Sequence, residues 1–151
     1  MTPSDMEDCF PQLTFTGYGI TSLQTPRYNC IAWAAGDTRK WWWPDPSPFT
    51  YWPPNIPREN TLQRFIEAFQ TLGYEPCGDS DFEPDIEKVV VYADDDGLPT
   101  HAARQLPTGA WTSKLGREED IEHHGLAGVE GEEYGHVVQV LRRPRLGPAS
   151  P

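Results

Sequence analysis

Positive charge is scarce in this sequence. The chain has 12 Lys and Arg against 23 Asp and Glu, which gives a net charge of −11 over 151 residues. Nucleic-acid binding depends on clustered Lys and Arg that neutralise phosphates, so this balance argues against a nucleic-acid partner. It argues against an anionic membrane surface for the same reason. Electrostatic steering should instead favour neutral or cationic substrates.

Long apolar runs are also missing. No window approaches the roughly 18 to 20 consecutive apolar residues that a membrane-spanning helix needs. The first ten residues, MTPSDMEDCF, are acidic and lack the basic region and apolar run of a secretory signal. We therefore expect a cytoplasmic protein, with export by a route that reads no N-terminal signal as the open alternative.

Motifs that hold phosphates, dinucleotides or metals do not occur. The sequence contains no GxxxxGK[ST], GxGxxG or GxSxG pattern, and its three cysteines, Cys9, Cys30 and Cys77, are too widely spaced for a zinc site. His123 and His124 are neighbours, and on a helix neighbouring side chains point about 100° apart. We therefore expect no metal and no cofactor, and a solvated acidic face around these histidines.

The residues in excess are 16 Pro, 13 Gly and 6 Trp. So many turn-forming residues indicate a loop-rich protein, and the aromatics suffice for a core. The length suits one domain. We expect an irregular lead-in over residues 1–27, a single α+β domain over residues 28–144 and a flexible tail over residues 145–151.

The pattern of apolar and turn residues predicts the elements of that domain. A short buried helix follows Asn29 as N-cap and ends at Gly36, and a second helix runs from Asn60 to Gly73. Three strands in an antiparallel meander come next, then a short helix, then a last strand. Their expected ranges are 87–93, 100–106 and 110–116 for the meander, 117–126 for the helix and 135–144 for the last strand.

A stretch of 19 residues between the two helices, RKWWWPDPSPFTYWPPNIP, is here called the Trp-rich loop (residues 39–57). Its six prolines remove hydrogen-bond donors and fix φ, so it cannot form a regular element. Two interpretations are open and compatible: a strap that covers the core, or a wall that lines a substrate site. In the second, Trp33 of the preceding helix joins Trp42, Trp43 and Trp52 in binding substrate.

Cys30 and His101 are the leading catalytic candidates. Cys30 lies at the start of the first predicted helix, where unpaired backbone N–H groups lower the pKa of a thiol and can also stabilise an oxyanion. A nucleophilic cysteine needs a base, and His101 begins the second strand of the predicted meander. The pair predicts attack of a thiolate on a carbonyl carbon.

Three polar residues are candidates to assist this pair. Alternation along the third strand places Ser113 on the face of Trp111, where its hydroxyl can bind the far nitrogen of His101. Gln105, on the face of His101, is the alternative partner. Gln24, six residues before Cys30, is a candidate to complete an oxyanion hole.

These motifs resemble known families at two levels. The segments YNCIAWAAGDTRKWWWP, EKVVVYADDDGLPTHAARQL, WTSKLG and YGHVVQVLRRP resemble an uncharacterised bacterial domain family of unknown function, over residues 28–144. More distantly, a cysteine that opens a buried helix, followed by a meander with a histidine on its second strand, resembles the NlpC-like branch of papain-fold cysteine peptidases. The third catalytic residue of that branch is usually His, Asn or Gln, whereas this sequence offers Ser113.

The distant resemblance implies a papain-like, NlpC-like α+β fold in which the cysteine helix packs on a small antiparallel sheet. It also implies a cysteine-dependent hydrolase or acyltransferase, with Cys30 as nucleophile and His101 as base, acting on an amide or ester bond. The expected substrate is a peptide, a glycan-peptide or a protein. The alternatives are a non-catalytic binding module that uses the Trp-rich loop, or a bacterial effector or toxin domain with a protein partner.

Overall fold

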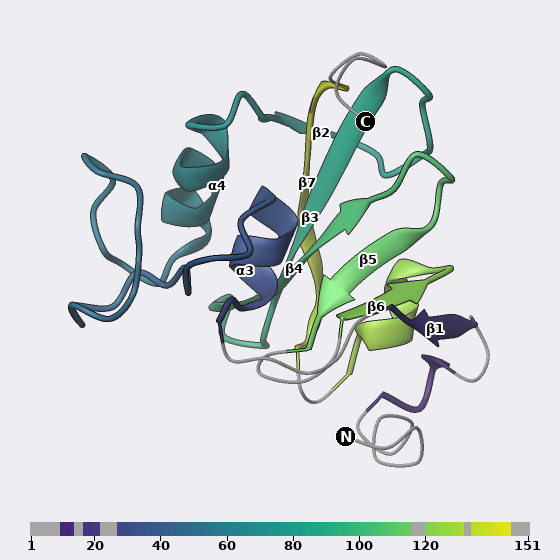
Figure 1. Ribbon diagram of the computed structural model, residues 1–151, viewed down its shortest axis with the longest axis horizontal. Coiled ribbons are helices and arrows are strands. Elements are labelled where there is room, and N and C mark those ends of the chain that lie inside the picture. Colours follow the sequence, from purple (N-terminus) through teal and green to yellow (C-terminus); the bar gives the residue numbers. More distant parts are fainter. Residues whose placement is uncertain (1–9, 14–16, 22–26, 116–119, 132–133, 146–151) are drawn as a thin grey trace.

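The computed structural model describes residues 10–13, 17–21, 27–115, 120–131 and 134–145, and in these residues a seven-stranded antiparallel sheet dominates (Figure 1). The order across the sheet is β1-β6-β5-β4-β3-β7-β2. The strands are β1 (Tyr18–Ile20), β2 (Glu75–Cys77), β3 (Ile86–Ala93), β4 (Pro99–Gln105), β5 (Trp111–Lys114), β6 (Asp120–His123) and β7 (His136–Pro144).

Helices form a small part of the described structure. They are α3 (Cys30–Ala35), α4 (Leu62–Gln70) and a single 3-10 turn, η1 (Leu126–Val129). Figure 1 shows α3 and α4 together on one side of the sheet. The predicted papain-like, NlpC-like α+β fold is therefore wrong: the described residues form a mainly β fold with two short α-helices. None of the helices in the described residues is long and apolar enough to cross a membrane.

The predicted meander is present, because its turn signals work as expected. Strand β3 pairs with β4, β4 with β5, and β5 with β6, all antiparallel. The β3–β4 turn closes through a hydrogen bond from the Asp94 N–H to the Leu98 carbonyl, with Gly97 at a φ of 80°. The predicted last strand is β7, which pairs with the opposite edge of β3.

The structure differs from the sequence-based elements in three places. Within the helix expected over residues 117–126, Asp120–His123 form strand β6, where Ile121 and His123 point into the core, and residues 117–119 lie outside the described residues. Two three-residue edge strands were not predicted: β2, and β1, which lies in the lead-in and pairs with β6. Such short strands carry too little pattern to detect, and their partners are distant in sequence. Residues 146–151 of the predicted tail lie outside the described residues.

Both predicted α-helices form, with one change of cap. The Asn29 side chain accepts the Ala32 N–H at the start of α3, and Gly36 ends that helix at a φ of 87°. The N-cap of α4 is Thr61 rather than Asn60, and its side chain accepts the Arg64 N–H. Side-chain oxygens satisfy otherwise unpaired helical N–H groups at both starts.

The sheet separates two hydrophobic clusters. The helix-side cluster contains α3, α4 and residues such as Val89, Val91 and Ala102. The second cluster, on the opposite face, contains Phe10, Val90, Tyr92, Ala103 and Trp111, among others. Successive side chains of a strand point to opposite faces, so β3 and β4 contribute to both clusters in alternation. This alternation decides which candidate site residues can meet.

Candidate functional site

Cys30 is buried on the helix side of the sheet. Its side chain lies at the start of α3, and its Sγ–H donates to the Thr100 carbonyl over 3.9 Å. Burial raises the pKa of the Cys30 thiol to about 11, although backbone hydrogen bonds and the nearby Lys114 act in the other direction. The expected lowering by the helix start is therefore outweighed by desolvation. At neutral pH this thiol is protonated.

His101 lies on the opposite side of the sheet. Its ring stacks on Tyr134, with centroids 4.0 Å apart, and also contacts Tyr92 of the second cluster. The next residue along β4, Ala102, belongs to the helix-side cluster with Cys30. The backbone of the sheet thus separates the thiol from the imidazole. The structure does not bring the predicted Cys30–His101 pair together.

The predicted contact between Ser113 and His101 is confirmed. The Ser113 Oγ lies 3.0 Å from His101 Nε2, and it also lies 2.7 Å from His123 Nε2. His123 Nδ1 in turn lies 2.9 Å from the Gly125 carbonyl. His123 was missed because the sequence placed it on a solvated helix, but the alternation of Ile121 and His123 carried the signal. The catalytic role of Ser113 stays a prediction.

The donors and acceptors of these groups fix the direction of each hydrogen bond from His101 to Gly125. A carbonyl accepts, so His123 Nδ1 carries the proton and donates to Gly125. Neutral His123 then accepts at Nε2 from the Ser113 hydroxyl, which leaves Ser113 Oγ to accept from an Nε2–H of His101. His101 Nδ1 is consequently an unprotonated acceptor, and it is buried without a hydrogen-bond partner in the described structure.

Burial keeps His101 and His123 neutral. His101, Ser113 and His123 are each 0% exposed. Desolvation lowers the pKa of His101 well below its ordinary value, with His123 as a second cause, and lowers the pKa of His123 to about 4. The arrangement is a closed polar network inside the second cluster, sealed from solvent in this conformation.

The remaining assisting residues do not join this network. Gln105 lies on the face of His101, but its Nε2 donates to the Gly109 carbonyl over 3.3 Å. Gln24 and Cys9 lie outside the described residues. Cys77 is a free, half-buried thiol whose Sγ–H donates to the Asp79 carbonyl. In the described ranges, no three His, Cys, Asp or Glu side chains gather closely enough to hold a metal ion.

The tryptophans predicted to bind substrate mostly support the core. Trp42 and Trp52 are 5% and 4% exposed. The Trp42 Nε1–H donates to Asp37, while Trp43 and Trp52 pack edge-on against Phe65 of α4. These contacts support the strap interpretation of the loop.

Trp33 sits on the outer edge of the helix-side cluster. Its Nε1–H donates to the Thr112 hydroxyl over 2.8 Å, and the Arg104 guanidinium lies above its ring. Tyr28 stacks against the Trp33 ring, with centroids 5.5 Å apart. Trp33 is thus partly buried against side chains of the domain itself.

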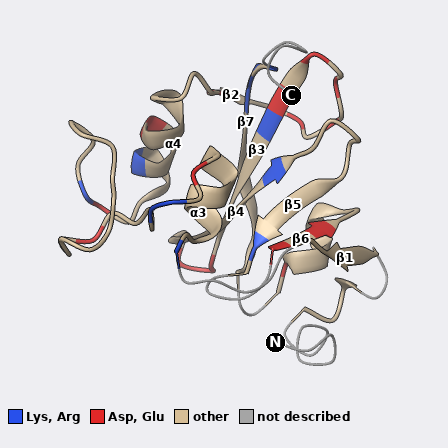
Figure 2. Ribbon diagram, viewed as in Figure 1, with Lys and Arg blue, Asp and Glu red and all other residues tan. Residues whose placement is uncertain are grey.

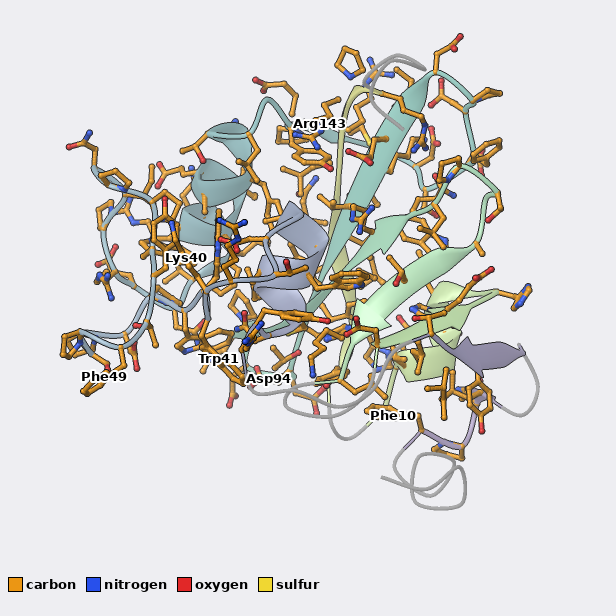
Figure 3. The ribbon with its side chains drawn as sticks, in the orientation of Figure 1. Phe10, Lys40, Trp41, Phe49, Asp94 and Arg143 are labelled. Carbon is orange, nitrogen blue, oxygen red and sulfur yellow. The ribbon has the colours of Figure 1, made fainter. Side chains whose placement is uncertain are left out.

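The outer part of the Trp-rich loop forms a pocket that the sequence did not predict. Its volume is about 430 Å³. Phe49, at the tip of the loop, is 90% exposed, and Figure 3 shows it far from the sheet, with Lys40 and Trp41 nearer α3. The pocket is lined by Arg27, Arg39, Lys40, Trp41, Pro48, Phe49, Thr50 and Tyr51. The pair Arg39–Lys40 directly before the tryptophans was the available signal.

Comparison with family models adds one finding. The model of a domain of unknown function, DUF7689, matches residues 19–142. The chain belongs to this family. Comparisons with curated proteins and with solved structures give no significant match. The buried histidine network and the pocket of the Trp-rich loop both lie within the part of the chain that matches DUF7689.

Removing the Ser113 hydroxyl should destabilise this DUF7689 domain. In Ser113→Ala, the ring nitrogens of His101 and His123 each lose a buried partner, and we expect a loss of about 2 to 4 kcal/mol in the free energy of unfolding. Urea denaturation measures it. Thr108→Ala, which removes a hydroxyl from an exposed turn, should change stability by less than about 0.5 kcal/mol. Equal effects of the two substitutions would contradict the network.

The neutral histidines should make the domain sensitive to acid. The unfolded chain binds protons at both histidines near pH 6.5, whereas folded His123 does so near pH 4. Stability is therefore fully present above about pH 6.5 and falls as the pH drops towards 4, by about 3 kcal/mol from His123. Urea denaturation between pH 4.5 and 7.5 measures this. Ring resonances of His101 or His123 that titrate near pH 6.5 by NMR would refute it.

Proposed function

We propose that this domain is a non-catalytic binding module whose contact surface is the outer part of the Trp-rich loop. The observation that supports this most directly is the pocket, which Phe49, 90% exposed, lines together with Trp41 and Tyr51. Aromatic side chains are enriched at binding surfaces because they give a large contact area at a small entropic cost. An aromatic so exposed at a loop tip contributes nothing evident to the core.

The loop is held in one shape by its own contacts. The Tyr51 N–H donates to the Trp41 carbonyl over 2.7 Å, and the Trp43 N–H donates to the Tyr51 carbonyl over 3.0 Å. The Arg58 guanidinium stabilises the outer part of the loop by donating hydrogen bonds to the carbonyls of Asp45 and Thr50. A surface that is ordered before binding loses less conformational entropy when a partner docks. The six prolines of the loop act in the same direction.

The geometry gives the cysteine-dependent reaction little support. That reaction needs a base within hydrogen-bond reach of the thiol, and His101 lies across the sheet from Cys30. Cys30 is also only 5% exposed, and burial raises the pKa of its thiol to about 11. A binding role needs neither a thiolate nor a base, so we favour it over the hydrolase or acyltransferase.

Thiol labelling separates the two functions. In a Cys9→Ser background, we expect a thiol-directed electrophile at pH 7 to modify the half-buried Cys77 faster than the buried Cys30. We expect Cys30 to react at the rate of Cys77 only after denaturation, and His101→Asn to leave its native rate unchanged. Mass spectrometry of digested samples measures each site. Rapid labelling of native Cys30, slowed in the His101 variant, would instead favour the cysteine-dependent enzyme.

Peptide selection tests the binding surface. From a displayed library of random peptides, we expect the wild-type domain to select ligands whose affinity falls at least about tenfold in Phe49→Ser. The matched control is Phe82→Ser, which removes a 40% exposed phenylalanine from a different loop. Titration calorimetry measures both variants, and urea denaturation shows that both are folded. Selected ligands that bind all three proteins equally would overturn the proposal.

A further inference from the structure

We propose that the pocket of the Trp-rich loop receives an acidic segment of a protein partner, with carboxylates at Arg39 and Lys40 and an apolar side chain against Phe49. This inference rests on the proposed binding function and names the chemistry of the ligand. It reverses the expectation from net charge, which favoured neutral or cationic substrates.

The charge around the pocket is opposite in sign to the net charge of the chain. The chain has 23 Asp and Glu against 12 Lys and Arg, yet three of those cations, Arg27, Arg39 and Lys40, line this pocket, and among the residues that the structure describes no acidic one lines it. Figure 2 shows basic positions at the start of the Trp-rich loop, shortly after α3. At physiological ionic strength, charges further away than about 8 Å are largely screened. A bound group therefore experiences the local cations more than the overall charge.

Arg39 and Lys40 are the two cations of the pocket that we expect to bind the carboxylates. In the described part of the chain, no carboxylate forms an ion pair with the side chain of Arg39 or Lys40. The Lys40 Nζ instead lies 4.3 Å from the centroid of the Tyr51 ring. The neighbouring Asp37 has both oxygens engaged, with the Arg39 N–H and the Trp42 Nε1–H. Both cations are thus available to an external anion.

The shape and chemistry of the lining favour a peptide as the source of that anion. A pocket of about 430 Å³ lies towards the small end of ligand sites and can take one or two side chains. An arginine guanidinium matches a carboxylate through two parallel hydrogen bonds. The exposed Phe49 offers apolar contact in the same pocket. A long polyphosphate would instead extend over a protein whose net charge is −11.

Defined peptides test this inference. The probes are fluorescein-labelled peptides with one central phenylalanine flanked on each side by two glutamates, two glutamines or two lysines. We expect the glutamate peptide to bind at least about tenfold more tightly than the glutamine peptide in 50 mM salt, and to weaken as salt rises. Fluorescence anisotropy measures the affinities.

Charge reversal at the pocket provides the matched comparison. Lys40→Glu should abolish the preference for the glutamate peptide. Arg142→Glu makes the same change in net charge at an exposed position of β7, and should preserve the preference. Equal urea midpoints show that both variants remain folded. Loss of the preference in both variants would mean that net charge, and not the pocket, selects the peptide, which overturns the inference.

The remaining outcomes separate this inference from the proposed function. If the glutamate and glutamine peptides bind equally and both lose affinity in Phe49→Ser, the loop binds a partner but the acidic ligand is wrong. If a single-stranded oligonucleotide binds the pocket more tightly than the glutamate peptide, the anion that the pocket prefers is a phosphate. This result would overturn the inference that the ligand is an acidic peptide. Absence of binding by every probe, together with library ligands that ignore Phe49, would overturn both proposals.

Discussion

The alternation of side chains along β4 is the constraint on which the rest of the structure depends. His101 and Ala103 face one hydrophobic cluster, and Ala102 faces the other. Because β3 and β4 are covered on both sides, no side chain of these strands can change face without disrupting a core. Cys30 therefore meets the backbone of β4, and His101 meets Ser113 of β5, which also contacts His123 of β6. Cys30 and His101, which resemble a catalytic pair in the sequence, are therefore buried on opposite faces of the sheet.

Desolvation then determines what each buried polar group can do. It raises the pKa of the Cys30 thiol and lowers the pKa of His101 and His123, so all three groups are neutral near pH 7. Neutral groups can be buried at a modest cost when they bond to one another, as Ser113 allows the two histidines to do. The polar network lies within a core, whereas the binding surface that we propose lies on the Trp-rich loop. That loop combines buried tryptophans, which anchor it to α4, with exposed aromatic and basic groups that remain available for binding.

The sequence by itself determined much of the local structure. Caps and glycines located α3 and α4 to within a few residues, turn signals located the meander, and strand alternation predicted the contact between Ser113 and His101. Prolines identified the Trp-rich loop as an ordered, irregular segment. These features depend on residues close in sequence, or on a period that adjacent strands share, so they can be read without knowing the fold.

Tertiary structure alone decided the features that depend on which surfaces meet. It placed Cys30 and His101 on opposite faces, turned the acidic segment around His123 into strand β6, and recruited β1 and β2 to the two edges of the sheet. It also gathered Arg27 with Arg39, Lys40 and Phe49 around one pocket. None of these has a local signature, because burial and proximity between distant segments follow from how the whole sheet is covered. Chain order suggested a catalytic pair, but the packing on each side of β4 decided that its members do not touch.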